Sequence, residues 1–219
     1  MKVVCFDLDD TLYKEIDFLK SAFKEVVAFA VERASLPCDF DVVYGAAVDA
    51  YLSGENAFGL IDDICGLHLD YSVYLDIYRN HKPEILLGSD ACELLASIKK
   101  TGDKIGLITD GRSVQQRNKI SALGLYDFVD NDDIVISEEF GLEKPSLANY
   151  KYFMERYPLA DEFIYVGDNI KKDFLAPNKL GWRTICLLDD GRNIHKQDFS
   201  QPHEFLPIMV VKSLLELSL

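Results

Sequence analysis

Two aspartates separated by one residue follow an apolar run near the start of the chain. The run is residues 3–6 (VVCF), and Asp7, Asp9, Asp10 and Thr11 come directly after it. In extended backbone Asp7 and Asp9 lean toward the same side. Two carboxylates so close repel each other unless a cation or a proton lies between them. The spacing therefore predicts a divalent metal ion, a carboxyl group with a raised pKa, or both.

Other side chains able to do chemistry follow later apolar runs. Thr109 ends the run at 105–109 and Asp110 follows it, and further along the chain are Lys144, Asp168 and Asp173. If these runs are parallel strands, their carboxyl ends lie on one edge of the sheet, where ligands bind. Several carboxylates beside one ammonium group suit a divalent cation next to an anion. Mg²⁺ is the natural partner of carboxylate and phosphate oxygens.

The elements that must position these side chains alternate regularly after residue 88. Short apolar runs predict strands, and segments with apolar residues at helical spacing lie between them. This alternation predicts an α/β fold, a Rossmann-like doubly wound parallel sheet with helices on both faces. The predicted strands are 3–6, 105–109, 134–137, 163–167, 184–188 and 208–211, and the predicted helices are 90–100, 114–123, 147–156 and 171–180.

Residues 14–87 contain no clear strand. Helical periodicity covers about 15–34, 42–51, 58–65 and 71–79. We therefore expect two domains: an α/β core made of residues 1–13 and 88–219, and a small all-helical cap inserted as residues 14–87. Tyr71, Tyr74 and Tyr78 recur at helical spacing within this insertion, which favours a packing stripe.

Composition narrows the possible partners. The chain has 219 residues and a formal net charge of −14, so it repels phosphate backbones, and neither nucleic acid nor an anionic membrane is an expected partner. Five cysteines without a C-x-x-C pair indicate a reducing compartment. The first residues lack the pattern of a signal peptide and no apolar run is long enough to span a bilayer. These features predict a cytoplasmic protein, either a monomer or a small homo-oligomer.

Four motifs in register carry a family resemblance. Asp7-x-Asp9-x-Thr11 is followed by Thr109, by Lys144-Pro145, and by Gly167-Asp168 with Asp173. In this order they resemble the haloacid dehalogenase (HAD) superfamily, which includes hydrolases that form an aspartyl phosphate. The resemblance spans nearly the whole α/β core, and the helical insertion lies where that family often places its cap. One departure is Asp110, because Thr-Asn-Gly is commoner than Thr-Asp-Gly at this motif.

The resemblance implies a role for each motif residue. Asp7 is expected to attack phosphorus as the nucleophile, and Asp9 to act as general acid and then as general base. For that, the pKa of Asp9 would have to be raised above that of a free aspartate. Thr109 and Lys144 would complete the catalytic set. The implied phosphate contacts are Leu8, Asp9, Thr109, Asp110 and Lys144, and the implied Mg²⁺ ligands are Asp7, Asp9 (through its backbone carbonyl), Asp168 and Asp173.

Asp9 also narrows the activity. Dehalogenating members of the family have no second aspartate at this position, so the sequence favours a phosphatase that acts on a small phosphorylated metabolite. A phosphosugar mutase, a phospho-acceptor signalling domain and an idle binding protein on the same fold remain alternatives. Lys14, Phe18 and Arg112 are candidates for substrate specificity, while Asp10 and Thr11 could equally serve only the turn. Which metabolite is the substrate does not follow from the sequence.

Overall fold

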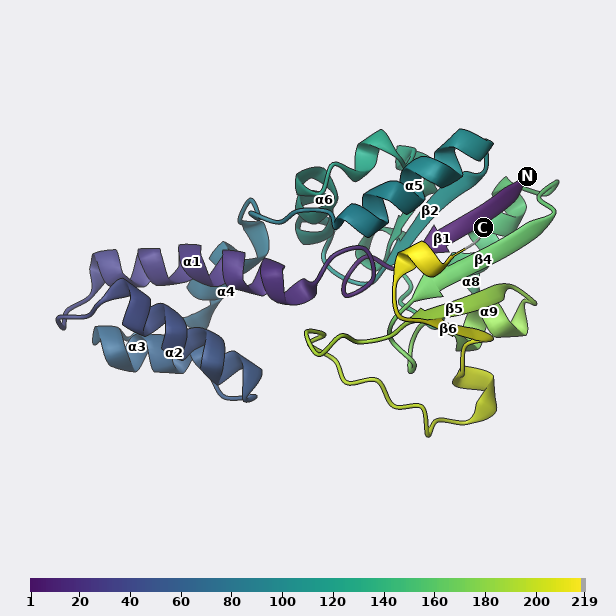
Figure 1. Cartoon of the computed structure of the whole chain (residues 1–219). Coiled ribbons are helices and arrows are strands. Elements are labelled where there is room, and N and C mark those ends of the chain that lie inside the picture. The colour runs from purple at the N-terminus through teal and green to yellow at the C-terminus, as the bar shows by residue number, and fades with distance from the viewer. Residues whose placement is uncertain (218–219) are drawn as a thin grey trace. The chain divides into compact units, whose positions relative to one another are not determined.

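The computed structural model describes residues 1–217, and the chain forms two compact units (Figure 1). The core unit comprises Met1–Glu15 and Leu86–Leu219, and the helical unit comprises Ile16–Ile85. The sequence places these divisions after residues 13 and 87, close to the observed ones.

A parallel sheet forms the centre of the core unit. Its strands are β1 (Lys2–Phe6), β2 (Lys104–Thr109), β3 (Ile134–Ile136), β4 (Glu162–Gly167), β5 (Arg183–Leu187) and β6 (Met209–Val211). They are hydrogen-bonded in the order β3-β2-β1-β4-β5-β6, and every pair is parallel. This is the strand order of a Rossmann-like sheet. The predicted fold class is confirmed, and β1 lies between β2 and β4, so the end of β1 is flanked by two other strand ends.

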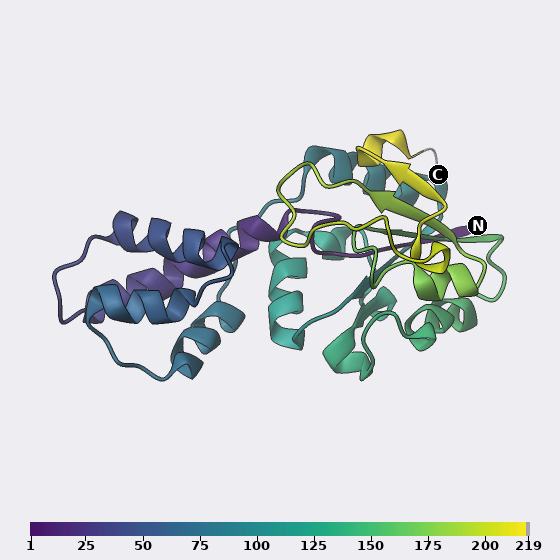
Figure 2. The ribbon, with the colours of Figure 1, turned by 90° about the horizontal axis from the view of Figure 1, so that it is seen from below.

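Helices cover both faces of this sheet, which explains why its strands are mostly apolar and are buried beyond their first residues (Figure 2). Helix α5 (Ser89–Thr101) and the short η4 (Leu214–Glu216) lie on one face, and α8 (Leu147–Arg156) and α9 (Leu175–Lys179) on the other. On the second face Val3 and Cys5 of β1 pack in one buried cluster with Tyr150, Phe153 and Trp182. This packing holds the central strand and hence the position of Asp7.

The structure corrects three details of the predicted elements. The helix predicted over residues 90–100 begins one residue earlier, at Ser89, and its N-cap is Gly88. Strand β3 ends at Ile136 because Ser137–Phe140 forms the short helix α7. The helix predicted from residue 171 begins only at Leu175. The amides of residues 172 and 173 bond instead to the carbonyl of Asn169, and this turn brings Asp173 to the edge of the sheet.

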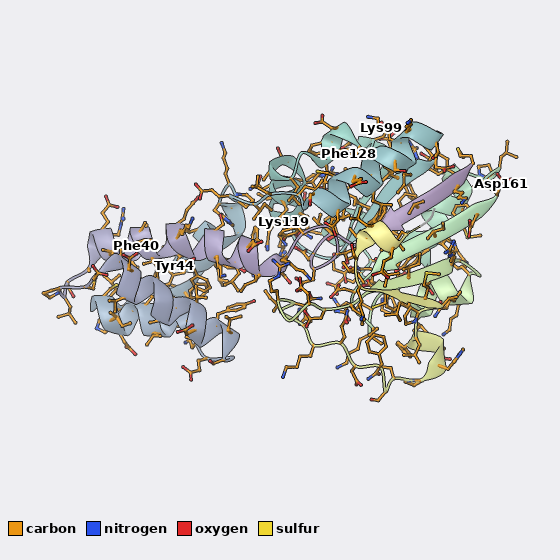
Figure 3. The ribbon with its side chains drawn as sticks, viewed as in Figure 1. Phe40, Tyr44, Lys99, Lys119, Phe128 and Asp161 are labelled. Carbon is orange, nitrogen blue, oxygen red and sulfur yellow. The ribbon has the colours of Figure 1, made fainter. Side chains whose placement is uncertain are left out.

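The helical unit contains helices α1 (Glu15–Arg33), α2 (Phe40–Leu52), α3 (Ala57–Cys65) and α4 (Tyr71–Asn80), close to the predicted ranges. The side chains of Asp39, Asn56 and Asp70 cap the last three helices. Figure 3 labels Phe40 and Tyr44 on α2, whose rings stack one turn apart. None of the helices within residues 1–217 has the length and apolar character that crossing a membrane requires.

Tyr74 of α4 packs inside this unit, as the tyrosine spacing predicts, whereas Tyr71 is 41% exposed. The Tyr74 side chain is fully buried, and its ring contacts those of Phe29 and Phe58. Its hydroxyl donates a hydrogen bond of 2.6 Å to the Asp62 carboxylate. The polar end of a buried tyrosine therefore has an acceptor, which removes the cost of burying it.

Candidate active site

Lys144 joins two carboxylates at the carboxyl edge of the sheet. Asp7 directly follows β1, and its amide continues the sheet by donating to the carbonyl of Val166. The Lys144 Nζ atom lies 2.8 Å from Asp7 Oδ1 and 2.8 Å from Asp173 Oδ1. All three side chains are buried. The structure thus brings together residues that are far apart in the sequence, as the strand-end argument predicts.

Asp7, Asp168 and Asp173 form a buried carboxylate cluster. One oxygen of each lies within 4.8 Å of the others. Both oxygens of Asp173 are already engaged: Oδ1 accepts from Lys144 and from the Tyr165 hydroxyl, and Oδ2 accepts from the amides of residues 168 and 169. A Cβ atom on Gly167 would lie 2.4 Å from Asp173 Oδ2. Only glycine at the end of β4 leaves room for this carboxylate.

Burial and crowding raise the proton affinity of this cluster. Burial raises the pKa of Asp7 to about 7, although the charge of Lys144 opposes the shift. Burial and the neighbouring Asp173 raise the pKa of Asp168 to about 9. Burial alone would lower the pKa of Lys144, but Asp173 and Asp7 outweigh it and raise that pKa well above its ordinary value. Three carboxylates against one ammonium group leave an excess of negative charge, and hard oxygen donors of this kind fit Mg²⁺.

Asp9 lies in different surroundings. The Lys119 Nζ atom is 2.6 Å from Asp9 Oδ1, and the Tyr13 hydroxyl donates to the same oxygen. Gln116 Nε2 donates to Asp9 Oδ2 at 3.0 Å. Burial by itself raises the pKa of Asp9, but the charge of Lys119 and these hydrogen bonds hold the pKa below its usual value. The shift in the pKa of Asp9 is therefore opposite to the one expected from the sequence.

Thr109 and Asp110 lie at the end of β2, on the same edge. Gln116 Nε2 also donates to the Thr109 hydroxyl oxygen, at 2.5 Å. Since that oxygen accepts this bond, its own hydrogen is available to an acceptor elsewhere. Asp110 accepts from the Lys144 amide with Oδ1 and from Lys172 Nζ with Oδ2. The Asp110 carboxylate thus positions the Lys144 loop. Because both of its oxygens already have donors, this side chain does not favour the predicted phosphate contact.

The turn after β1 is built by Asp10. This residue has φ of 56°, a left-handed conformation that aspartate tolerates better than most residues. Its carboxylate accepts from the amides of Glu15 and Ile194, so Asp10 serves the turn. The Thr11 hydroxyl is buried and has no partner among the described residues. The predicted phosphate contacts of the Leu8 and Asp9 amides stay predictions.

The three candidate specificity residues have other partners in the structure. Lys14 Nζ contacts Asn193 Oδ1 at 2.7 Å and Asp190 at 3.2 Å. Arg112 pairs with Glu138 at 2.6 Å. The Phe18 ring packs in the helical unit against the rings of Tyr78 and His81, and Phe18 is fully buried. These contacts indicate positioning roles for Lys14 and Arg112 and a packing role for Phe18, and contact with substrate stays a prediction for each.

Sequence reasoning missed the partners of the motif aspartates. Gln116 and Lys119 are three residues apart on α6 (Ser113–Ala122), so they share a helix face directly after the Thr109 motif. That spacing was a signal available in the sequence. No sequence signal pointed to Asn193, because it lies in the irregular segment after β5. Its Nδ2 atom donates to Asp168 Oδ2 at 2.9 Å. Only the folded chain brings it to the site.

A small cavity of about 130 Å³ opens among these side chains. Asp7, Asp9, Thr109 and Lys144 line it, so the predicted catalytic residues share one space. Four polar residues that the motifs do not include also line the cavity: Glu15, Asn169, Lys172 and His195. Acid, base, cation and hydroxyl groups converging on one cavity can bind an anion and transfer protons to and from it.

Comparison with known proteins defines the class. The sequence matches the haloacid dehalogenase-like hydrolases over residues 4–187, and the chain belongs to this family. It is an enzyme of the phosphoric monoester hydrolase type.

Two relatives and one solved structure are informative. Glyceraldehyde 3-phosphate phosphatase of Methanocaldococcus jannaschii is 32% identical over 197 residues, covering 86% of this chain and 85% of that protein. Ribulose-1,5-bisphosphate 5-phosphatase of Halopiger xanaduensis is 32% identical over 209 residues, covering 84% and 83%. The crystal structure of the HAD-hydrolase YfnB of Bacillus subtilis bound to magnesium superposes with a TM-score of 0.67 at 21% identity, covering 98% and 96%, and supports the fold.

Proposed function

We propose that this protein is a Mg²⁺-dependent phosphatase that hydrolyses a small phosphorylated sugar through a phosphoaspartyl intermediate on Asp7. The observation that carries the proposal is the buried group of Asp7, Asp168 and Asp173 around Lys144, with Asp9 lining the same cavity. Phosphoryl transfer asks mainly for positioning and for stabilisation of charge, and this group supplies both.

The residues that would hold Mg²⁺ are Asp7 and Asp168, together with the backbone carbonyl of Asp9. Asp173 has both oxygens occupied by donors, so its part is to hold Lys144 and the loop of Asp168, reaching the metal through water at most. The bound cation would neutralise phosphoryl oxygens and favour the ionised form of Asp7.

In the first step an oxygen of Asp7 attacks phosphorus, and the bond between phosphorus and the ester oxygen breaks. Asp9 gives a proton to the departing alkoxide. The incoming phosphate adds negative charge beside Asp9 and so raises the pKa that Lys119, Tyr13 and Gln116 lower. Lys144 and the Thr109 hydroxyl stabilise the charge on the phosphoryl oxygens.

In the second step Asp9, now a carboxylate, takes a proton from water. The resulting hydroxide attacks phosphorus, the bond between phosphorus and Asp7 breaks, and inorganic phosphate leaves. Asp7 returns as a carboxylate and Asp9 returns protonated, so the cycle is balanced. Because Asp9 lines the same cavity as the lysine-bound Asp7, a single carboxyl group can serve in both steps.

Support for a small phosphosugar comes from the relatives. By their names, the relative from Methanocaldococcus jannaschii acts on glyceraldehyde 3-phosphate and the relative from Halopiger xanaduensis acts on ribulose 1,5-bisphosphate. The cavity of about 130 Å³ also has room for a phosphate group with a short polar chain. A triose or pentose phosphate is therefore the substrate class that we propose.

Release of inorganic phosphate tests the proposal directly. The purified chain is incubated with glyceraldehyde 3-phosphate, ribulose 1,5-bisphosphate and a nucleoside 5′-monophosphate, with Mg²⁺ or with EDTA. Turnover of a sugar phosphate that needs Mg²⁺ and is lost in Asp7→Asn supports the proposal. Stable phosphorylation of Asp7 without turnover indicates a signalling domain instead. Conversion of a sugar phosphate into an isomer without release of phosphate indicates a mutase.

A further inference from the structure

Lys119 is a buried lysine that the four motifs do not include. Its side chain is 2% exposed, compared with 18% for Asp9, which it contacts at 2.6 Å. Figure 3 labels this residue, which stands on α6. A buried ammonium group is costly unless it is paired and hydrogen-bonded. Removing Lys119 would leave the Asp9 carboxylate without its cationic partner, so each of the two charges stabilises the other.

Two neutral donors complete the surroundings of Asp9. The Tyr13 hydroxyl donates to Oδ1 and Gln116 Nε2 donates to Oδ2. A carboxylate only accepts hydrogen bonds, so the nitrogen of the Gln116 amide must face Asp9, and its second hydrogen reaches Thr109 Oγ1. Gln116 therefore ties the orientation of Asp9 to the orientation of the Thr109 hydroxyl.

We propose that Lys119, assisted by Gln116 and Tyr13, is the positioning residue of Asp9. These donors contact both carboxylate oxygens of Asp9 and hold its side chain toward the leaving group and the attacking water. They also keep it apart from the Asp7, Asp168 and Asp173 cluster, whose lysine is Lys144. Lys119 does not line the cavity, so it acts through Asp9 and not on the phosphate. This inference rests on the proposed function, because it assumes that Asp9 transfers the proton.

Substrates with different leaving groups separate this role from a structural one. p-Nitrophenolate leaves without a proton, whereas an alkoxide needs one. In Lys119→Met we expect kcat for glyceraldehyde 3-phosphate to fall about 100-fold, within the usual range for losing general acid catalysis. With p-nitrophenyl phosphate the first turnover should still appear as a burst, followed by a slow steady state, because only the later attack by water needs Asp9.

Three further measurements sharpen the test. The inhibition constant of inorganic phosphate should be close to that of the wild type, since Lys119 does not touch the phosphate. Lys119→Arg should restore part of kcat, because it keeps a cation beside Asp9. Lys151→Met removes an exposed lysine from α8 and serves as the matched control, with wild-type kinetics expected.

The outcomes are decisive in both directions. The inference is overturned if kcat of Lys119→Met falls equally with both substrates and no burst appears. Wild-type kinetics in Lys119→Met also overturn it. If Lys119→Met does not fold, Tyr13→Phe and Gln116→Leu must show the same dependence on the leaving group at smaller size, and its absence overturns the inference. Failure of the proposed function looks different: the wild type then releases no phosphate, or Asp9→Asn leaves turnover unchanged.

Discussion

Asp7 and Asp9 are separated by one residue, and each faces a buried lysine, yet their carboxyl groups differ. Lys144 lies 2.8 Å from Asp7, and Lys119 lies 2.6 Å from Asp9. The pKa of Asp7 is raised to about 7, whereas the pKa of Asp9 is lowered. In both cases burial favours the protonated form, so burial alone does not explain the difference.

The balance of charges and donors explains it. Lys144 is shared between Asp7 and Asp173, and Asp168 adds a third carboxylate. Asp9 has a lysine together with the donors Gln116 and Tyr13. One aspartate therefore lies in a group that lacks positive charge and suits a cation, while the other already accepts from three donors. A lysine contact by itself does not tell which aspartate will be ionised.

The largest expected effect comes from Asp7→Asn. The variant lacks the proposed nucleophile, so we expect kcat to fall by about 10⁴-fold or more and no phosphoenzyme to form. Phosphate release and intact-protein mass spectrometry measure the two quantities. Asp63→Asn, which changes an exposed residue of α3, is the matched control. A phosphorylated Asp7→Asn protein would contradict the assignment of the nucleophile.

Asp9→Asn should have a smaller effect of a different kind. Loss of the general acid and base lowers kcat by about 10²- to 10⁴-fold. With p-nitrophenyl phosphate the phosphoenzyme should accumulate, because attack by water on it lacks a base. Mass spectrometry of protein quenched in acid detects the added phosphoryl group. If Asp9→Asn behaves like Asp7→Asn and never becomes phosphorylated, the two aspartates do not have the separate roles of nucleophile and general acid and base.

Asn193→Ala should affect the metal and not the proton transfer. Asn193 Nδ2 orients Asp168 through a hydrogen bond of 2.9 Å, and loss of such a contact typically costs about 10- to 100-fold in metal affinity. We expect a higher Mg²⁺ concentration for half-maximal activity, with kcat at saturating Mg²⁺ near that of the wild type. A Mg²⁺ titration of initial rates measures this, and an unchanged titration curve speaks against Asp168 as a ligand.

Asp110→Asn should have the smallest effect. Asparagine keeps an oxygen that can accept from the Lys144 amide and loses only the ion pair with Lys172, whose side chain is 44% exposed. Exposed ion pairs contribute about 1 kcal/mol or less, so kcat/KM should change about fivefold or less. Asp110→Ala also loses the acceptor of the Lys144 amide, so its kcat/KM should be clearly lower than that of Asp110→Asn. Equal effects of the two substitutions would show that positioning of the Lys144 loop does not matter.

Much of the fold and of the motif set could be predicted from the local pattern. Strand runs such as residues 3–6 are apolar because both faces of the sheet are covered. The spacing of apolar residues also changes clearly between strands and helices. The order of motifs at strand ends then places Asp7, Thr109, Lys144 and Asp168 on one edge, since parallel strands all end there. Less regular stretches were harder: the residues before α9 have helical periodicity, but they form the turn that delivers Asp173.

The amino-acid sequence alone was sufficient to find the two aspartates, the expected metal site and the family, because these depend on residue type and on spacing along the chain. Only the tertiary structure distinguished the proton affinities of the two carboxyl groups. The donors that lower the pKa of Asp9 come from α6 and from Tyr13, and the donor that orients Asp168 comes from a segment beyond β5. Proton affinity depends on distances and burial in space, and no spacing in the sequence specifies either.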